Sequence, residues 1–226
     1  MCGRFTLTTP GELVAEAFGL DETPELAPRY NIAPSQPVAI LRRVQRTEPR
    51  RLAFVRWGFV PSWSLDPWRR GPLINARSET AAEKSSFREA FERRRCLIPA
   101  DGFYEWKPVP GSRAKQPFAI RLRDGRPFAF AGLWEPPAPA EAEPVETCTI
   151  LTTQPNGLLR PIHDRMPVIL PPEEYEPWLD PGPARPGELL ALLRPYPAEA
   201  MVCFPVGRAV NDPRNEGPEC AAPLGA

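Results

Sequence analysis

Residues 96–106 read Cys96-Leu97-Ile98-Pro99-Ala100-Asp101-Gly102-Phe103-Tyr104-Glu105-Trp106. Two runs of apolar residues flank Ala100-Asp101, which predicts two paired strands joined by a tight turn. Alternation along the second strand places Glu105 on the same face as Phe103, with aromatic neighbours on both sides. A carboxyl group in apolar surroundings holds its proton more tightly, as catalytic acids do, whereas a Glu on an edge strand faces water. This stretch alone leaves both interpretations open.

Similar apolar runs recur on either side of this stretch, and short amphipathic segments separate them. Strands are predicted over 38–43, 51–55, 118–122, 128–133, 145–151 and 201–206, and helices over 12–18, 81–94, 173–179 and 188–194. We expect 38–43 and 51–55 to form a hairpin, and 118–122 to pair with 128–133 through a turn at Asp124-Gly125. The chain therefore reads as one β-rich α+β domain spanning 1–226. It should be ordered to about 211–215, with a flexible tail.

Charge is distributed unevenly along the 226 residues, although the formal net charge is zero. Up to Arg126 the chain has 22 basic and 14 acidic side chains, and after it 6 basic and 14 acidic. Such an asymmetry is consistent with an anion-binding face in the first half or with chance differences on a solvated surface. The 33 prolines favour turns and stiff loops over long helices.

Cysteine and histidine usage argues against a metal centre or a disulfide framework. The five cysteines are odd in number and scattered, without a CxxC pair, and His163 is the only histidine. We therefore expect no metal and no cofactor. No apolar run approaches the length of a membrane span and no signal peptide is evident, so the expected location is the cytoplasm.

The chain opens with Met1-Cys2, and a side chain as small as that of Cys2 permits removal of the initiator methionine. Cys2 then carries an α-amine and a thiol on adjacent carbons, with ordinary pKa values of ~8 and ~8.5. A 1,2-aminothiol condenses with an aldehyde to a five-membered thiazolidine ring, and its thiol can also attack an acyl carbon. The alternative is a stray cysteine at a frayed terminus.

Three further features suit a functional site, although each also has an ordinary structural explanation. Asn75 and Arg77 share a face if their segment is extended, and His163 lies in a proline-flanked polar turn. Trp57, Trp63 and Trp68 stand among Gly, Pro and Arg, where they either plug the core or form a stacking platform for nucleic-acid bases. A lone histidine is commonly structural.

Seven short stretches together resemble one known family. They are Met1-Cys2-Gly3-Arg4, Tyr30-Asn31-Ile32-Ala33-Pro34, Trp57-Gly58-Phe59-Val60-Pro61, Asn75-Ala76-Arg77-Ser78-Glu79-Thr80, Arg95-Cys96-Leu97-Ile98-Pro99, Gly102-Phe103-Tyr104-Glu105-Trp106 and His163-Asp164-Arg165-Met166-Pro167. In this order, from residue 2 to about Asn211, they resemble the SRAP (SOS-response-associated peptidase) family of abasic-site processing proteins. No catalytic position departs from the family pattern.

The resemblance implies a single domain with a barrel-like, mixed or antiparallel β core, a few short peripheral helices and a basic groove. The groove would bind single-stranded DNA with abasic sites, or junctions of single- and double-stranded DNA. It implies that Cys2 forms the covalent crosslink, that Asn75 holds the sugar, and that Glu105 and His163 transfer protons. The expected DNA contacts are Arg4, Arg77, Asn31, Trp68 and Arg165. The family would act as a cytoplasmic monomer, nucleoid-associated when crosslinked, with self-catalysed removal of Met1 and DNA lyase activity as side reactions.

Two rival functions fit part of the sequence. Cys-Gly after Met1 also opens N-terminal-nucleophile amidohydrolases, in which the amine is the base and an oxyanion hole stabilises the intermediate. That alternative leaves the aromatic and arginine-rich loop, Glu105 and His163 without roles. A plain single-stranded-DNA binder without a covalent step is the other alternative, and it would tolerate loss of Cys2.

Overall fold

The computed structural model describes residues 2–64, 71–138, 144–182 and 185–225. Five of its strands close into a barrel, because β10 pairs with β4, β4 with β3, β3 with β6, β6 with β9, and β9 again with β10. Their bounds are β3 (Pro37–Arg42), β4 (Arg51–Trp57), β6 (Arg95–Ala100), β9 (Phe128–Glu135) and β10 (Thr147–Thr153). The β10–β4 pairing is parallel and the other four are antiparallel. A mixed, barrel-like β core is therefore confirmed.

Three short strands extend the barrel on its outside. β5 (Asn75–Arg77) pairs in parallel with β10, β11 (Met166–Pro167) pairs antiparallel with β10, and β12 (Ile169–Leu170) pairs antiparallel with β9. Asn75 and the turn before Met166 are far apart in sequence, but these pairings bring both of them to β10.

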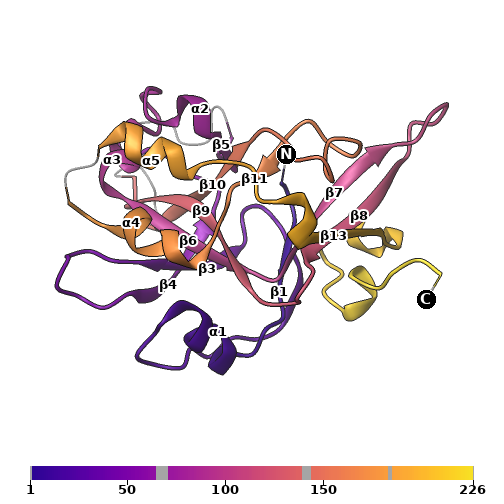
Figure 1. Ribbon diagram of the computed structural model, residues 1–226, viewed down its shortest axis with the longest axis horizontal. Coiled ribbons are helices and arrows are strands. Elements are labelled where there is room, and N and C mark those ends of the chain that lie inside the picture. Colours follow the sequence, from indigo (N-terminus) through magenta and orange to yellow (C-terminus); the bar gives the residue numbers. More distant parts are fainter. Residues whose placement is uncertain (1, 65–70, 139–143, 183–184, 226) are drawn as a thin grey trace.

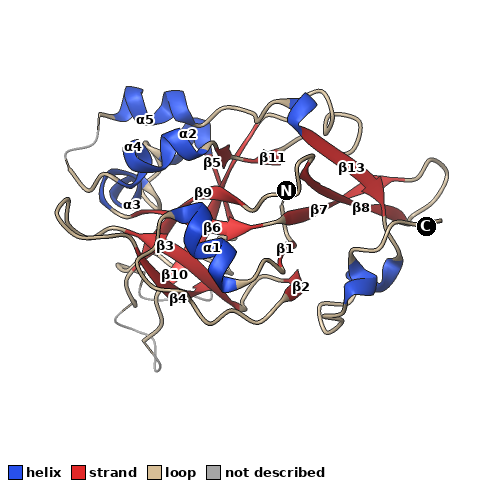
Figure 2. Cartoon of the chain, turned by 60° about the horizontal axis from the view of Figure 1, so that its bottom comes forward, coloured by secondary structure: helices blue, strands red, loops and turns tan. Residues whose placement is uncertain are grey.

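A second, antiparallel sheet stands beside the barrel, in the order β13-β8-β7-β1-β2 (Figures 1 and 2). Its strands are β1 (Phe5–Leu7), β2 (Arg29–Ile32), β7 (Gly102–Pro108), β8 (Lys115–Leu122) and β13 (Met201–Pro205). In the view of Figure 1 the chain's N-terminus enters near the middle of the molecule, between the two sheets. Cys2 and Phe5 are buried, whereas Gly3 and Arg4 between them are half-buried.

The strands on either side of Asp101 exist as predicted, but they do not pair with each other. β6 belongs to the barrel and β7 to the second sheet. At the crossing, the Asp101 carboxylate accepts hydrogen bonds from the backbone N–H of Thr8 (2.5 Å) and Thr9 (2.9 Å). These bonds hold the crossing against the end of β1, so the chain passes into the other sheet instead of folding back as a hairpin.

The second predicted pair, 118–122 with 128–133, is also wrong, because its two strands join different sheets. β8 and β9 are both strands, but β8 pairs with β7 and β13, whereas β9 pairs with strands of the barrel. In contrast, the hairpin of β3 and β4 is confirmed, with register from Pro37↔Arg56 to Arg42↔Arg51. Local turn signals thus locate the strands without specifying which sheet each strand joins.

The single helix predicted over 81–94 is two short helices, α2 (Ser78–Ala81) and α3 (Arg88–Arg93), separated by turns. Phe87, the residue directly ahead of α3, packs against Phe59, with ring centroids 5.4 Å apart. Phe91 packs instead on Trp178, at 5.9 Å. The Phe91 amide still donates to the Phe87 carbonyl at 2.7 Å, so these two buried residues keep the predicted helical spacing and the break lies ahead of them, after Ala81.

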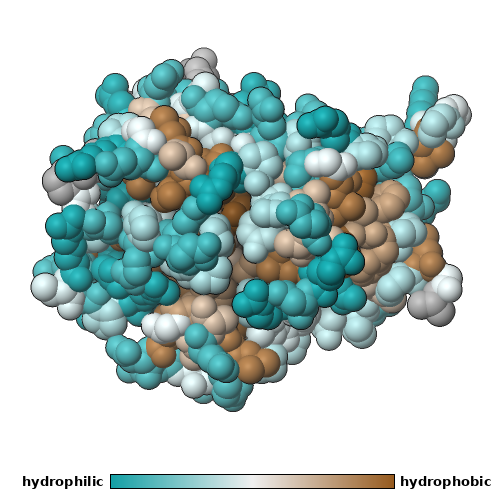
Figure 3. Space-filling view, in the orientation of Figure 1, coloured by the Kyte–Doolittle hydropathy of each residue, from teal (hydrophilic) through white to brown (hydrophobic). Residues whose placement is uncertain are grey.

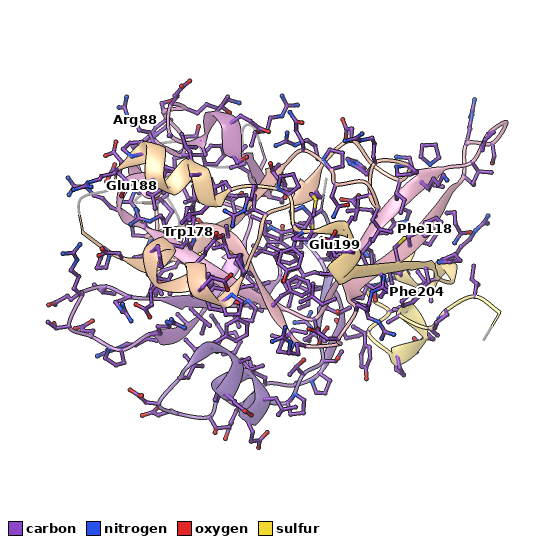
Figure 4. All side chains as sticks on the ribbon, viewed as in Figure 1. Arg88, Phe118, Trp178, Glu188, Glu199 and Phe204 are labelled. Atoms are coloured by element: carbon purple, nitrogen blue, oxygen red, sulfur yellow. The ribbon has the colours of Figure 1, made fainter. Side chains whose placement is uncertain are left out.

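The other helices match the predicted positions closely. α1 (Gly11–Phe18) ends at Gly19, whose φ of 61° is the left-handed conformation that glycine adopts most easily. α4 (Tyr175–Leu179) follows a 3-10 turn at Pro172–Glu174, and α5 covers Pro186–Leu192. Trp178 of α4 lies over the barrel, and its indole N–H donates to the Cys96 carbonyl at 2.9 Å (Figure 4).

The C-terminal segment packs on the second sheet, which differs from the flexible tail expected from the sequence. It contains 3-10 turns at Ala198–Ala200, Arg208–Asn211 and Pro218–Cys220, and Val206 forms a bridge with Pro223. Cys220 is fully buried in a small cluster with Tyr104 and Val210. Apolar residues spaced irregularly between prolines gave no periodic signal for this packing.

The main core lies between the barrel and the second sheet. Phe5 of β1 meets Trp57 of β4 at 5.2 Å and Phe130 of β9 at 5.7 Å, and Phe103 of β7 meets Phe130 at 6.0 Å. All four side chains are at most 1% exposed. Because the rings lock β1 into both layers, the residues just ahead of Phe5 have little freedom of position.

Candidate active site around Cys2

The chain's second residue is completely buried at the junction of the two layers. β1 pairs with β7 at Phe5↔Phe103, and the Tyr104 amide donates to the Arg4 carbonyl at 3.0 Å, which extends the pairing toward the N-terminus. Continued by two residues, the antiparallel register brings Gly3 opposite Glu105. The start of the chain is therefore led directly past the Glu105 carboxyl.

Asn75 holds the backbone of Cys2 from the barrel side. Its Nδ2 donates to the Cys2 carbonyl at 2.8 Å, and Asn75 itself is placed by the parallel pairing of β5 with β10 at Ile150. The Oδ1 atom of Asn75 is buried and accepts no hydrogen bond from the described residues. A buried amide oxygen without a donor is costly, so this atom is suited to accept a hydrogen bond from a bound ligand.

Glu105 is 2% exposed, and burial raises the pKa of its carboxyl to about 7, with a further contribution from the charge of Asp164. Desolvation penalises the charged form, so near neutral pH about half of these carboxyls keep their proton. A proton held at this pH can be donated and taken back within one reaction cycle.

His163 faces Glu105 from the turn before β11, with Nε2 3.9 Å from Glu105 Oε2. The backbone N–H of Arg165 donates to His163 Nδ1 at 3.1 Å, so the neutral ring carries its proton on Nε2. Asp164 Oδ1 lies 2.9 Å from the same Nδ1, but the Asp164 side chain is 87% exposed and solvent screens this pair. Partial burial lowers the pKa of His163, so the imidazole is mainly neutral at pH 7.

The turn that carries His163 is organised by Asn156, a residue that sequence reasoning missed. Asn156 Oδ1 accepts the backbone N–H groups of Leu158 (3.1 Å) and Leu159 (3.0 Å), and the His163 amide donates to the Leu159 carbonyl at 2.9 Å. The dipeptide Asn156-Gly157, a common turn signal, was the available clue.

The Cys2 thiol is completely enclosed by the surrounding residues. Burial raises the pKa of the thiol, and the nearby charge of Glu105 raises it further. The Sγ atom contacts the Arg4 carbonyl oxygen at 3.8 Å. The thiolate is the nucleophilic form, so this thiol is held unreactive.

Arg4 is fixed from two sides. Its Nη1 donates to Asn31 Oδ1 at 3.0 Å and to the Val210 carbonyl at 2.7 Å, and its guanidinium lies 6.0 Å from the Trp106 ring centroid. Asn31 itself is fully buried, and its Nδ2 donates to the carbonyls of Asp212 and Asn215, each at 2.9 Å. The Asn31 side chain thus orients Arg4 and does not reach the surface.

The remaining sequence candidates differ in their environments. Arg77 on β5 is exposed. Arg165 forms a bidentate ion pair with Glu79, at 2.7 and 2.8 Å, and also donates to the Thr152 carbonyl at 2.6 Å, so it ties α2 to β10. Trp68 lies outside the described residues. The structure therefore brings Cys2, Asn75, Glu105 and His163 together, with Arg4 alongside.

Within the described ranges, no group of three or more His, Cys, Asp or Glu side chains could hold a metal ion. All five cysteines are free. None of the helices that the structure describes has both the length and the hydrophobicity needed to cross a membrane.

Comparison with known proteins places this geometry in context. The abasic site processing protein YoqW of Bacillus subtilis is 45% identical over 222 residues, which cover 97% of this chain and 98% of that protein. The protein YedK of Escherichia coli, which has the same descriptive name, is 36% identical over 231 residues, covering 99% and 100%. A crystal structure of a Bacteroides thetaiotaomicron protein superposes with a TM-score of 0.83 at 26% identity, covering 99% and 100% of the two chains. The family model described as SOS response associated peptidase (SRAP) matches residues 1–213, and the chain belongs to this family.

Proposed function

We propose that this protein captures abasic sites in single-stranded DNA covalently, through the amine and thiol of Cys2 after Met1 has been removed. The observation that carries the proposal is the convergence of Asn75, Glu105 and His163 on the N-terminal residue, with a carboxyl whose pKa is about 7. The names of the relatives, abasic site processing proteins, support the same conclusion. Arg4 and Arg77 would contact the flanking phosphates.

The reaction follows from the groups at hand. The α-amine of Cys2 attacks C1′ of the ring-opened sugar to give a carbinolamine, and Glu105 donates the proton with which the hydroxyl leaves as water. The thiol then adds to the resulting Schiff base, its proton passes to the nitrogen, and the thiazolidine ring closes. The minor protonated form of His163 donates a proton to the sugar ring oxygen while the C1′ hydroxyl gives its proton to water, which opens the ring to the aldehyde. Asn75 Oδ1 accepts a hydrogen bond from a sugar hydroxyl.

The same intermediates explain two side activities. A Schiff base that loses the 3′-phosphate by β-elimination before the thiol adds would cleave the DNA strand, which is lyase activity. Met1 must leave before any of these steps, because its peptide bond occupies the α-amine of Cys2. Self-catalysed removal of Met1 would be a peptidase reaction. One chain supplies every group, so a monomer suffices.

The test is a denaturing gel of the mature protein mixed with uracil-excised single-stranded DNA. We expect a slowly migrating band that resists denaturation and that Cys2→Ala, or one additional residue ahead of Cys2, abolishes. Cys203→Ala is the matched control, because it removes a different, partly exposed thiol and should leave the band intact. Absence of the band with the mature wild-type protein contradicts the proposal.

The pH profile tests the role of Glu105 separately. Because the protonated carboxyl is the donor, crosslinking measured by single-turnover kinetics should slow as the pH rises through about 7. Glu105→Gln should crosslink slowly and without this inflection. An unchanged inflection in the variant would assign the proton donor to another group.

A further inference from the structure

The hairpin of β7 and β8 extends beyond the body of the second sheet. The two strands pair as far as Pro108↔Lys115, and 109–114 form the turn. β13 pairs with β8 only between Phe118 and Leu122, and β1 pairs with β7 only near Phe103. Along the outer part of the hairpin, neither strand has another neighbour among the described strands, and Figure 1 shows this part projecting at upper right.

The turn of this arm (residues 107–115) has a defined structure. The Val109 amide donates to the Ala114 carbonyl at 3.3 Å, the Ser112 amide to the Val109 carbonyl at 3.1 Å, and the Ala114 amide to Ser112 Oγ at 3.0 Å. Gly111 adopts φ 74°, as the turn requires. The arm is therefore preformed, and contacts made by it incur little ordering entropy.

The arm carries three cations, Lys107, Arg113 and Lys115, all of them exposed. No described acidic side chain forms an ion pair with any of them, and the sequence contains no Asp or Glu between Trp106 and Arg123. Elsewhere several exposed or half-buried arginines are paired, among them Arg42 with Glu146 and Arg43 with Glu176. In the space-filling view the projecting part has hydrophilic atoms at its tip beside a smaller apolar area (Figure 3), and Val109 in the turn is 40% exposed.

The arm begins at the candidate active site. Glu105 lies on β7 only two residues before Lys107, about 7 Å along a strand. Lys115 is near enough for its charge to lower the pKa of both Glu105 and His163. The arm carries no aromatic side chain beyond Trp106, so it offers no stacking platform for bases. Cations without aromatic rings suit backbone phosphates.

We propose that this arm is a second DNA-contacting element, in which Lys107, Arg113 and Lys115 bind backbone phosphates of the lesion-bearing strand, two or more nucleotides from the captured sugar. The inference rests on the proposed function. It adds a contact apart from Arg4 and Arg77, which are proposed above to contact the flanking phosphates, and it predicts that affinity depends on the length of the flanking strand.

The experiment measures equilibrium binding against salt concentration in a Cys2→Ala background, where no crosslink forms. The probe is a single-stranded oligonucleotide with one abasic site, either with long flanks or trimmed to one nucleotide on each side. Removing three phosphate contacts from single-stranded DNA lowers the slope of log K against log salt by about 2. We expect this loss for Lys107→Ala/Arg113→Ala/Lys115→Ala on the long probe only.

Two controls make the result specific to the arm. Arg88→Ala/Arg93→Ala removes exposed cations from α3, and Figure 4 shows Arg88 at the opposite end of the molecule, so the slope should not change. Lys107→Arg/Arg113→Lys/Lys115→Arg keeps the charges and should keep the slope. If the triple alanine variant keeps the full slope, the inference is overturned. The proposed function stands in that case when the same three substitutions, made in the protein that retains Cys2, leave crosslinking at saturating DNA intact. Wild-type protein that neither binds nor crosslinks overturns both.

Discussion

Replacing Glu105 by Gln should make the protein more stable above neutral pH while impairing its chemistry. Burial raises the pKa of this carboxyl from 4.5 to about 7, so the folded state binds the proton more tightly than the unfolded state. Wild-type stability therefore falls as the pH rises from 4.5 to about 7 and is constant above it. At 1.36 kcal/mol per unit of pKa, the loss is about 3 kcal/mol. Gln cannot ionise, so the variant does not lose this stability as the pH rises.

The assay is thermal unfolding of wild type and Glu105→Gln at pH 5 and pH 8, with Met1 either retained or removed in both. Because the unfolded carboxyl is already mostly ionised at pH 5, about 2.5 kcal/mol of this loss falls between the two pH values. For a chain of this length that corresponds to a relative gain of roughly 5–10 °C for the variant. Glu79→Gln is the matched control, because the hydrogen bond from Arg165 lowers the pKa of Glu79 and its small effect has the opposite sign. An equal difference between wild type and Glu105→Gln at both pH values would refute the raised pKa.

Three further predictions concern the surroundings of the site. Asn31→Ala should weaken DNA binding several-fold in fluorescence anisotropy, because Arg4 loses its side-chain acceptor. Wild-type affinity in this variant would show that Arg4 needs no such support. Gly132→Ala should lower the free energy of unfolding by about 1–3 kcal/mol in denaturant titrations, since its methyl group would lie within 3.0 Å of two barrel side chains, whereas Gly157→Ala, with open space around it, should be neutral. Asp101→Ala should cost about 2–4 kcal/mol by the same measurement, because two backbone N–H groups lose their acceptor, and a loss below 0.5 kcal/mol would contradict that role.

The sequence located most secondary-structure elements but not their partners. Apolar alternation and turn residues identify β6 and β7, yet the pattern is the same whether the two strands pair or enter different sheets. The decision lies in Asp101, whose carboxylate reaches threonines more than ninety residues earlier in the chain. Likewise, Phe87 and Phe91 pack on Phe59 and Trp178, two aromatic residues distant in sequence. Tertiary contacts of this kind are not encoded in local periodicity.

The candidate site was predictable as a set of residues and not as an arrangement. The resemblance pointed to Asn75, Glu105 and His163, and the structure gives the geometry that brings them to Cys2. Asn31 shows the limit of such reasoning, because a polar residue in a characteristic stretch looks the same whether it contacts a ligand or holds a neighbour. Only its complete burial separates the two cases.

The Glu216 carboxylate accepts hydrogen bonds from the backbone N–H groups of Tyr30 (2.7 Å) and Asn31 (2.9 Å) on β2, the outermost strand of the second sheet. A side chain thus occupies the positions that a further strand would take, and it blocks the addition of one from another molecule. Ending the expressed protein at residue 213, where the family match stops, would remove Glu216 and leave these backbone N–H groups of β2 open. Such a shortened protein should self-associate through β2, and its sedimentation should depend on concentration where that of the full chain does not.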